Sequence, residues 1–229
     1  MQTVSRTPEQ RRAGLIAARI LLEIGAVTFR PDEPYTLTSG WKSPVYVDMR
    51  RVISFPRARR KITELATDCI LTEVGYESID AVAGGETAGI PYAAWLSDAL
   101  MAPMLYVRKK PKGFGRNAQI EGAMEEGLRV LLVEDLASDA ASKVVFVNAL
   151  RGAGAKVSDV LVLFFYGVFP GALETLEEIG VTLHFLANWW DVLEEAEKGA
   201  YFDRKAIDEV RNFLHDPTGW SKLHGGKDL

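Results

Sequence analysis

The chain has 229 residues, of which 48% are hydrophobic and 25% charged, and its formal net charge is −4. This composition is typical of one soluble globular domain and argues against a general nucleic-acid binder. The apolar runs are far shorter than a membrane span, so we expect no membrane insertion. The single cysteine, Cys69, excludes an internal disulfide framework and favours a cytoplasmic location. The histidines at 184, 215 and 224 lack metal-ligand spacing.

The first third of the chain predicts a helix, a small flap and a second helix. Residues 7–10 read TPEQ, the order of a helix N-terminus, and Gly25 fits the end of that helix. Short β-like runs at 26–29, 35–37 and 45–49 indicate a small antiparallel flap. A long helix with one apolar face follows from Pro56 to Gly75.

From residue 79 onward the predicted strands and helices alternate. Strands are expected at 79–83, 104–108, 130–133, 157–166 and 181–186. Repeated β-loop-α units predict the α/β class, with a central, mostly parallel sheet flanked by helices. We expect a single domain over 1–229, with the helix and flap at about 8–50, the core at about 56–188, C-terminal helices at about 189–216 and loose final residues.

The stretch RVLLVEDLASDAAS, residues 129–142, is the centre of the functional prediction. Four apolar residues read as a buried strand, and Glu134 and Asp135 follow at once, the later one expected on a loop. Ligands bind at the carboxyl ends of strands in open α/β sheets, and a carboxylate pair can accept both hydroxyls of a ribose. The alternative is a pair of acids that favours the dipole of the next helix.

Two loops could complete such a site. Residues 84–89, GGETAG, follow a strand and precede a helix, so their backbone N–H groups could approach an anion, although a plain tight turn explains them equally well. Residues 108–122, RKKPKGFGRNAQIEG, are strongly basic in an acidic protein. This segment could be an ordinary surface loop or a cationic lid over a phosphorylated substrate.

Taken together, these segments resemble the type I phosphoribosyltransferases, and among them the orotate phosphoribosyltransferases. Residues 130–142 are similar to the phosphoribosyl-pyrophosphate motif: four apolar residues, two acids and a Thr- and Gly-rich loop. Residues 108–115 resemble the catalytic loop, which has Arg-Lys, a Lys three residues on and then His-Gly. Residues 35–50 and 84–94 resemble the N-terminal segment and the pyrophosphate loop, and GRNAQIEG with the later FFYG resembles the branch found in alphaproteobacteria.

The resemblance implies the type I phosphoribosyltransferase fold with a small N-terminal hood. It implies transfer of the phosphoribosyl group from phosphoribosyl pyrophosphate to orotate, which gives orotidine 5-monophosphate and pyrophosphate in de novo pyrimidine (UMP) synthesis. Magnesium is the implied cofactor, held mostly through substrate and water, with Asp135 as the candidate protein ligand. A homodimer is also implied, in which each lid reaches the neighbouring subunit's site.

The resemblance implies roles for particular residues. The implied catalytic residues are Arg108, Lys109, Lys112 and Asp135, the three basic ones neutralising the departing pyrophosphate. The implied substrate-binding residues are Glu134, Asp135, Ser138, Asp139, Ala140, Ala141, Ser142, Gly85, Glu86, Thr87, Thr38 and Lys42.

The sequence departs from the family pattern at the phosphate loop and the lid. Ala140 stands where the family has a strict glycine, and a left-handed backbone there would cost about 1 kcal/mol. Asp139 adds negative charge to the phosphate loop, and Phe114 replaces the lid histidine. Thr38 replaces the Lys of Lys-Ser-Gly, although Lys42 is near, and residues 164–171 lack an Arg for the orotate carboxylate.

These departures define the competing hypothesis. It is a catalytically weakened homologue that binds a nucleotide or phosphosugar and acts as a regulator. A purine-specific transferase is disfavoured, because the lid and the N-terminal segment both resemble the orotate branch. The leading prediction is an active orotate phosphoribosyltransferase.

Overall fold

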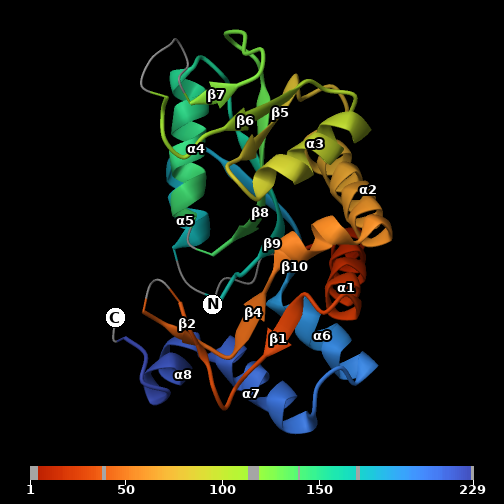
Figure 1. Ribbon diagram of the computed structural model, residues 1–229, viewed down its shortest axis with the longest axis vertical. Helices are drawn as coiled ribbons and strands as arrows, with labels where there is room; N and C mark the ends of the chain where they lie inside the picture. Colours follow the sequence, from red (N-terminus) through yellow and green to blue (C-terminus); the bar gives the residue numbers. More distant parts are fainter. Residues whose placement is uncertain (1–4, 38–39, 113–118, 139, 169–170, 228–229) are drawn as a thin grey trace.

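The computed structural model describes residues 5–37, 40–112, 119–138, 140–168 and 171–227. A six-stranded sheet forms its centre, in the spatial order β10-β9-β8-β5-β6-β7 (Figure 1). The strands are β5 (Ala81–Gly85), β6 (Met104–Val107), β7 (Ile120–Glu121), β8 (Val130–Ala137), β9 (Asp159–Phe165) and β10 (Thr182–Asn188). Neighbouring strands are parallel except β6 and β7, which pair antiparallel. The predicted mostly parallel α/β sheet is therefore confirmed.

Helices cover both faces of this sheet, as the alternation of side chains along β8 requires. Leu131 and Val133 belong to a core shared with α1 (Pro8–Glu23), α2 (Pro56–Glu73) and α3 (Gly89–Ala99). Val130 and Leu132 point the other way, into a second core with α4 (Ala141–Gly152) and α5 (Ala172–Glu178). A strand buried on both faces explains why the sequence shows a continuous apolar run rather than an alternation.

The predicted flap consists of two small antiparallel pairs. β1 (Val27–Phe29) pairs with β4 (Val45–Val47), and β2 (Tyr35–Thr36) pairs with β3 (Lys42–Ser43). A 3-10 helix, η1 (Met49–Ser54), connects the flap to α2. Two buried tyrosines attach this region to the core: the Tyr92 hydroxyl donates to the Met49 carbonyl at 2.5 Å, and the Tyr166 hydroxyl donates to the Val45 carbonyl at 3.2 Å. Since Tyr166 directly follows β9, the flap lies next to the carboxyl end of that strand.

Three helices follow the sheet: α6 (Trp189–Gly199), α7 (Arg204–His215) and α8 (Pro217–Leu223). The expectation of loose final residues is wrong for α8. Asp216 caps its first turn, and Trp220 is only 5% exposed, with its ring 5.5 Å from that of Phe213. A single buried tryptophan on a seven-residue helix anchors the segment, and one such contact leaves no period in the sequence.

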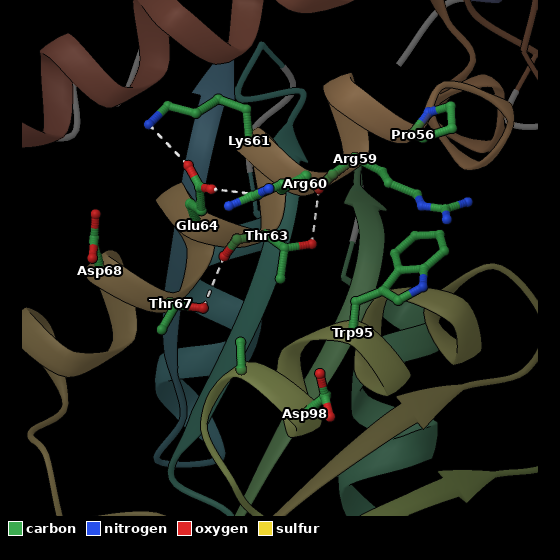
Figure 2. A pocket seen from close by; sticks show the side chains of 11 residues that line it. Pro56, Arg59, Arg60, Lys61, Thr63, Glu64, Thr67, Asp68, Trp95 and Asp98 are labelled. Atoms are coloured by element: carbon green, nitrogen blue, oxygen red, sulfur yellow. Dashed lines mark hydrogen bonds and ion pairs between the residues drawn. The ribbon is translucent and has the colours of Figure 1, made fainter.

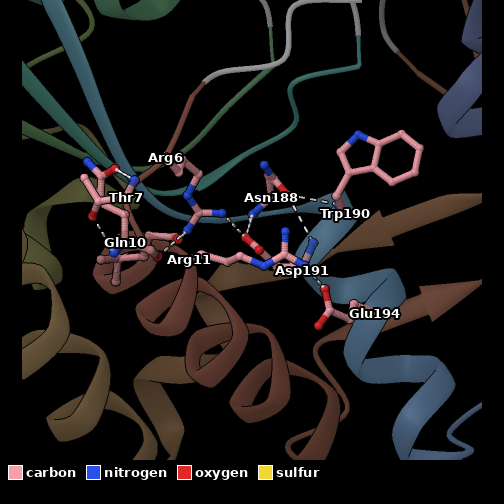
Figure 3. A network of polar contacts seen from close by, with 9 residues as sticks. Arg6, Thr7, Gln10, Arg11, Asn188, Trp190, Asp191 and Glu194 are labelled. Atoms are coloured by element: carbon pink, nitrogen blue, oxygen red, sulfur yellow. Dashed lines mark hydrogen bonds and ion pairs between the residues drawn. The ribbon is translucent and has the colours of Figure 1, made fainter.

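The N-terminal segment is held by a buried ion pair. Thr7 and Gln10 form the predicted capping box of α1. Just before it, the Arg6 guanidinium lies 2.6 Å from the Asp191 carboxylate of α6 and donates to the Leu186 carbonyl of β10 at 2.7 Å (Figure 3). This network joins the start of the chain to its last strand.

A second polar cluster lies at the amino end of β9. The His184 ring on β10 is 2.7 Å from the Glu73 carboxylate and 2.8 Å from the Asp159 carboxylate. Burial alone would lower the pKa of His184, but its hydrogen bonds to Asp159 and Glu73 raise it to about 9. Burial would likewise raise the pKa of Glu73, but hydrogen bonds from His184, Gln10 and Cys69 lower it to about 2.

We predict that this cluster makes the free energy of unfolding depend on pH. The contribution of His184 is complete below its ordinary pKa of 6.5 and disappears as pH rises toward about 9. The contribution of Glu73 is complete above 4.5 and disappears as pH falls toward about 2. Denaturant unfolding of the wild type and His184→Gln should therefore differ most, by about 2 kcal/mol, near pH 5–6, and less at either extreme. A difference that is constant with pH would contradict the ionic assignment.

Candidate active site

Both acids of the pair lie inside β8. The expectation that the later acid sits on a loop is wrong, because β8 continues to Ala137 and pairs with β9 through Ala137↔Phe165. Consecutive strand residues face opposite ways. Glu134 therefore points toward α4 and is 6% exposed, whereas Asp135 is half-buried on the side of α3. On that side, burial raises the pKa of the Tyr92 hydroxyl, and the negative charge of Asp135 adds to the rise.

The Glu134 carboxylate packs against the GGETAG loop, and it lies where two glycines of that loop would otherwise carry a side chain. A Cβ at Gly85 would lie 2.3 Å from Glu134 Oε1 and 2.6 Å from the Phe146 ring. A Cβ at Gly89 would lie 2.7 Å from the same oxygen and 2.4 Å from the Val133 carbonyl oxygen. These glycines therefore admit the carboxylate of the neighbouring strand, which a plain tight turn does not explain.

Glu134 has a charged partner that the sequence did not reveal. Burial, with the charge of Asp135, raises the pKa of Glu134 to about 7, and the nearby Lys143 and Lys109 oppose that rise. Lys143 is 5% exposed, and its ammonium lies 3.5 Å from Glu134 Oε2. A positive charge in the first turn of a helix interacts unfavourably with the helix dipole. That unusual position of Lys143 was the only feature of the sequence that could have indicated its pairing with Glu134.

In the predicted phosphate loop, Ala140 has a backbone conformation that is unfavourable for alanine. Ala140 is the N-cap of α4 and adopts φ 62° and ψ −7°, the left-handed conformation that favours glycine. Ala141 and Ser142 form the exposed start of the helix, and Ser138 is half-buried before it. The N-terminus of a helix attracts anions, so this arrangement suits a phosphate. Asp139 lies outside the described residues.

We predict that Ala140→Gly stabilises the fold. Glycine accepts φ 62° without the clash of a Cβ, so the free energy of unfolding should rise by up to about 1 kcal/mol. Ala141→Gly is the matched control: Ala141 is the first residue of α4, where glycine should lower the free energy of unfolding, by less than the roughly 1 kcal/mol that it costs in a helix interior. Denaturant titrations of the two variants should shift in opposite directions, and a shift in the same direction would contradict this explanation.

The base of the predicted lid is attached to the GGETAG loop. The backbone N–H of Lys109 donates to the Glu86 carboxylate at 2.7 Å. Two further basic residues of the predicted lid converge on Glu121 of β7, which the sequence did not single out: Arg108 Nη1 lies 3.6 Å from its carboxylate, and Lys112 forms a shorter ion pair. The hydrogen bond from Lys112 is the largest cause of the lowered pKa of Glu121. The β6–β7 pairing thus holds both ends of the lid, while residues 113–118, including Phe114, lie outside the described part.

The remaining predicted residues are more dispersed. Thr87 is exposed on the GGETAG loop, next to Glu86. The Lys42 ammonium donates to Thr36 Oγ1 at 2.7 Å within the flap rather than to the acid pair. Thr38 and residues 169–170 lie outside the described residues. The structure therefore brings together the GGETAG loop, the base of the predicted lid at Lys109, the start of α4 and the acid pair of β8. Lys42 is instead hydrogen-bonded within the flap.

A cleft of about 700 Å³ lies elsewhere, between α2 and α3 (Figure 2). The Arg59 guanidinium lies 5.1 Å from the centre of the Trp95 ring, and Glu64 is paired with Arg60 and Lys61. None of the predicted site residues lines this cleft.

Within the described ranges, no helix is long and apolar enough to cross a membrane. Over the same residues, no group of three or more His, Cys, Asp and Glu side chains could hold a metal ion.

Comparisons with known proteins show which family the chain belongs to. No protein-family model matches the chain. Its sequence is 52% identical over 220 residues to an orotate phosphoribosyltransferase of Ruegeria sp. (strain TM1040), covering 96% of this chain and 97% of the relative. The crystal structure of orotate phosphoribosyltransferase from Aeropyrum pernix matches with a TM-score of 0.68 and 33% identity, over 81% of this chain and 99% of that one. Leishmania donovani UMP synthase matches with a TM-score of 0.76 and 28% identity over 90% of this chain, which spans only 43% of that protein. At this identity over nearly its whole length, the chain belongs to the orotate phosphoribosyltransferase family.

Proposed function

We propose that this protein transfers the phosphoribosyl group from phosphoribosyl pyrophosphate to orotate, giving orotidine 5-monophosphate and pyrophosphate for pyrimidine synthesis. The observation that carries the proposal is the carboxyl end of β8, where Glu134 and Asp135 are followed by the left-handed turn and the N-terminus of α4. Carboxylates that accept ribose hydroxyls lie there directly before a helix start suited to a phosphate. The relatives support this transferase and give no support to the regulatory alternative.

Each element around β8 receives one part of the substrate in this proposal. Glu134 and Asp135 hold the ribose hydroxyls, and residues 138–142 hold the 5-phosphate at the start of α4. Gly85, Glu86 and Thr87 bind the pyrophosphate. The attachment of Lys109 to Glu86 supports this assignment, since it places the base of the cationic lid beside that loop.

The lid supplies the positive charge that the reaction requires. The bond from the anomeric carbon to pyrophosphate weakens before the orotate nitrogen attacks, so negative charge develops on the leaving group. Arg108, Lys109 and Lys112 would neutralise that charge. Lys42, with Thr38 nearby in sequence, would complete the substrate site from the flap.

Magnesium fits the donors that are present. Mg²⁺ is commonly held by one or two carboxylates, with substrate phosphates and water as the other ligands. Asp135 is half-buried and provides one such carboxylate. When bound, the ion would supply positive charge that stabilises the departing pyrophosphate.

We further infer that the chain works as one domain in a cytoplasmic homodimer, with each lid serving the partner's site. The family resemblance supports the shared lid, and the free thiol of Cys69 supports a reducing compartment. Light scattering should give a particle of twice the chain mass of 25.3 kDa. A monomer that is fully active would contradict the shared lid.

The test of the activity is direct. Purified protein is incubated with orotate, phosphoribosyl pyrophosphate and magnesium, and the loss of orotate absorbance is followed, with each component omitted in turn. We expect absorbance to fall only in the complete mixture and orotidine 5-monophosphate to appear. Binding of phosphoribosyl pyrophosphate in calorimetry without any loss of orotate would contradict the transferase and favour the regulatory homologue.

A further inference from the structure

Lys143 is a buried lysine whose surroundings belong to the predicted sugar-phosphate site. Its side chain is 6% exposed, in the first turn of α4. The ammonium lies 3.5 Å from Glu134 Oε2, donates to Ser142 Oγ at 3.2 Å and donates to the Leu136 carbonyl. Its three hydrogen-bond partners thus lie on β8, which carries the acid pair, and on the first turn of α4.

Ordinary packing does not account for a charge at this position. A lysine at a helix N-terminus opposes the helix dipole, and burial of its ammonium carries a desolvation cost. Leu150 and Phe146 on the same helix fill comparable buried positions with apolar side chains. The charge is therefore explained by its partner, the Glu134 carboxylate.

We propose that Lys143 is a positioning residue of the phosphoribosyl site, which fixes the Glu134 carboxylate and joins the acid strand to the phosphate loop. Lys143 holds Oε2, and Gly85 and Gly89 leave room for Oε1. The carboxylate then presents one oxygen in a fixed orientation to a ribose hydroxyl. This inference rests on the proposed function, because it assigns Glu134 to the ribose.

A double-mutant cycle tests whether Lys143 acts through Glu134. The affinity for phosphoribosyl pyrophosphate with magnesium is measured by calorimetry, at one fixed pH, for the wild type, Glu134→Gln, Lys143→Met and the double variant. Lys143→Met should weaken binding by about tenfold or more in the wild-type background and by no more than about twofold in the Glu134→Gln background. Equal losses in both backgrounds would overturn the proposal, because a general structural defect does not depend on Glu134.

Three controls make the result specific. Lys143→Arg keeps the charge and should recover most of the lost affinity. Lys156→Met removes an exposed lysine that lies beyond the C-terminal end of α4, and it should leave affinity unchanged. Inorganic phosphate, which needs only the phosphate loop, should bind Lys143→Met within about threefold of the wild type, as expected when only the ribose contact is lost.

Loss of folding in Lys143→Met would not prevent a decision. The double variant has no unpaired buried charge and should fold. Its affinity should match that of Glu134→Gln within about twofold, and a much weaker double variant would overturn the proposal. Failure of the proposed function is distinguishable, since the wild type would then consume no orotate, whether or not it binds phosphoribosyl pyrophosphate.

Discussion

Replacement of Lys112 by alanine is expected to lower kcat for orotate consumption by about 100- to 1000-fold, the range for loss of a charge that stabilises a developing anion. Lys112 is an exposed lid residue whose ammonium is paired with Glu121 of β7. In the working enzyme that ammonium would move from Glu121 to the departing pyrophosphate. Since the contact strengthens as charge develops, the loss should fall mainly on kcat, with KM for orotate changed little.

Lys110→Ala is the matched control for this effect. Lys110 lies two residues from Lys112 on the same exposed segment, so its replacement by alanine removes the same charge from the lid. We expect the kcat of this variant to stay within about twofold of the wild type. Salt screens exposed charges, so a lysine that does not contact the substrate has little effect on the charge that develops there. Steady-state assays at fixed ionic strength check both variants. Equal losses from Lys110→Ala and Lys112→Ala would mean that only the net charge of the lid matters.

Mixing two inactive variants should restore about a quarter of the wild-type activity if lids are shared between subunits. One variant is Lys112→Ala, with a defective lid, and the other is Asp135→Asn, with a defective acid strand. When subunits exchange at equal concentration, about half of the dimers are hybrids. In each hybrid, the site with an intact Asp135 receives the intact lid of its partner, and the other site receives both defects.

The control for this experiment is a mixture of Lys112→Ala with Lys109→Ala. Every site in such hybrids receives a damaged lid, so activity should remain at the level of the separate variants. Activity is measured as orotate loss after mild denaturation and refolding of the mixed chains. If the lid serves its own subunit, the Lys112→Ala and Asp135→Asn mixture will stay inactive, because no hybrid then contains a complete site.

Much of the fold follows from local sequence patterns. The capping box at Thr7, the flap strands β1, β2 and β4 and the alternation of strands and helices were predictable, because caps, prolines and apolar periods act over a few residues, whereas the two-residue strand β3 was not predicted. β7 and α8 were not predictable, since two paired residues and one anchoring tryptophan leave no period to detect. Both are stabilised by contacts with distant segments.

The sequence by itself determined which parts the proposed site is built from: an acid pair after an apolar run, a glycine loop and a basic segment occur along the chain. Only the tertiary structure decided how these parts act together. It placed both acids within β8, because pairing with β9 extends that strand to Ala137. It also showed that Gly85 and Gly89 make room for the Glu134 carboxylate, and that Lys143 is its buried partner. Gly85 and Gly89 are roughly 50 residues from Glu134 in the sequence, and Lys143 is nine residues from it. The distances between these side chains depend on sheet pairing and helix packing, which no local sequence pattern encodes.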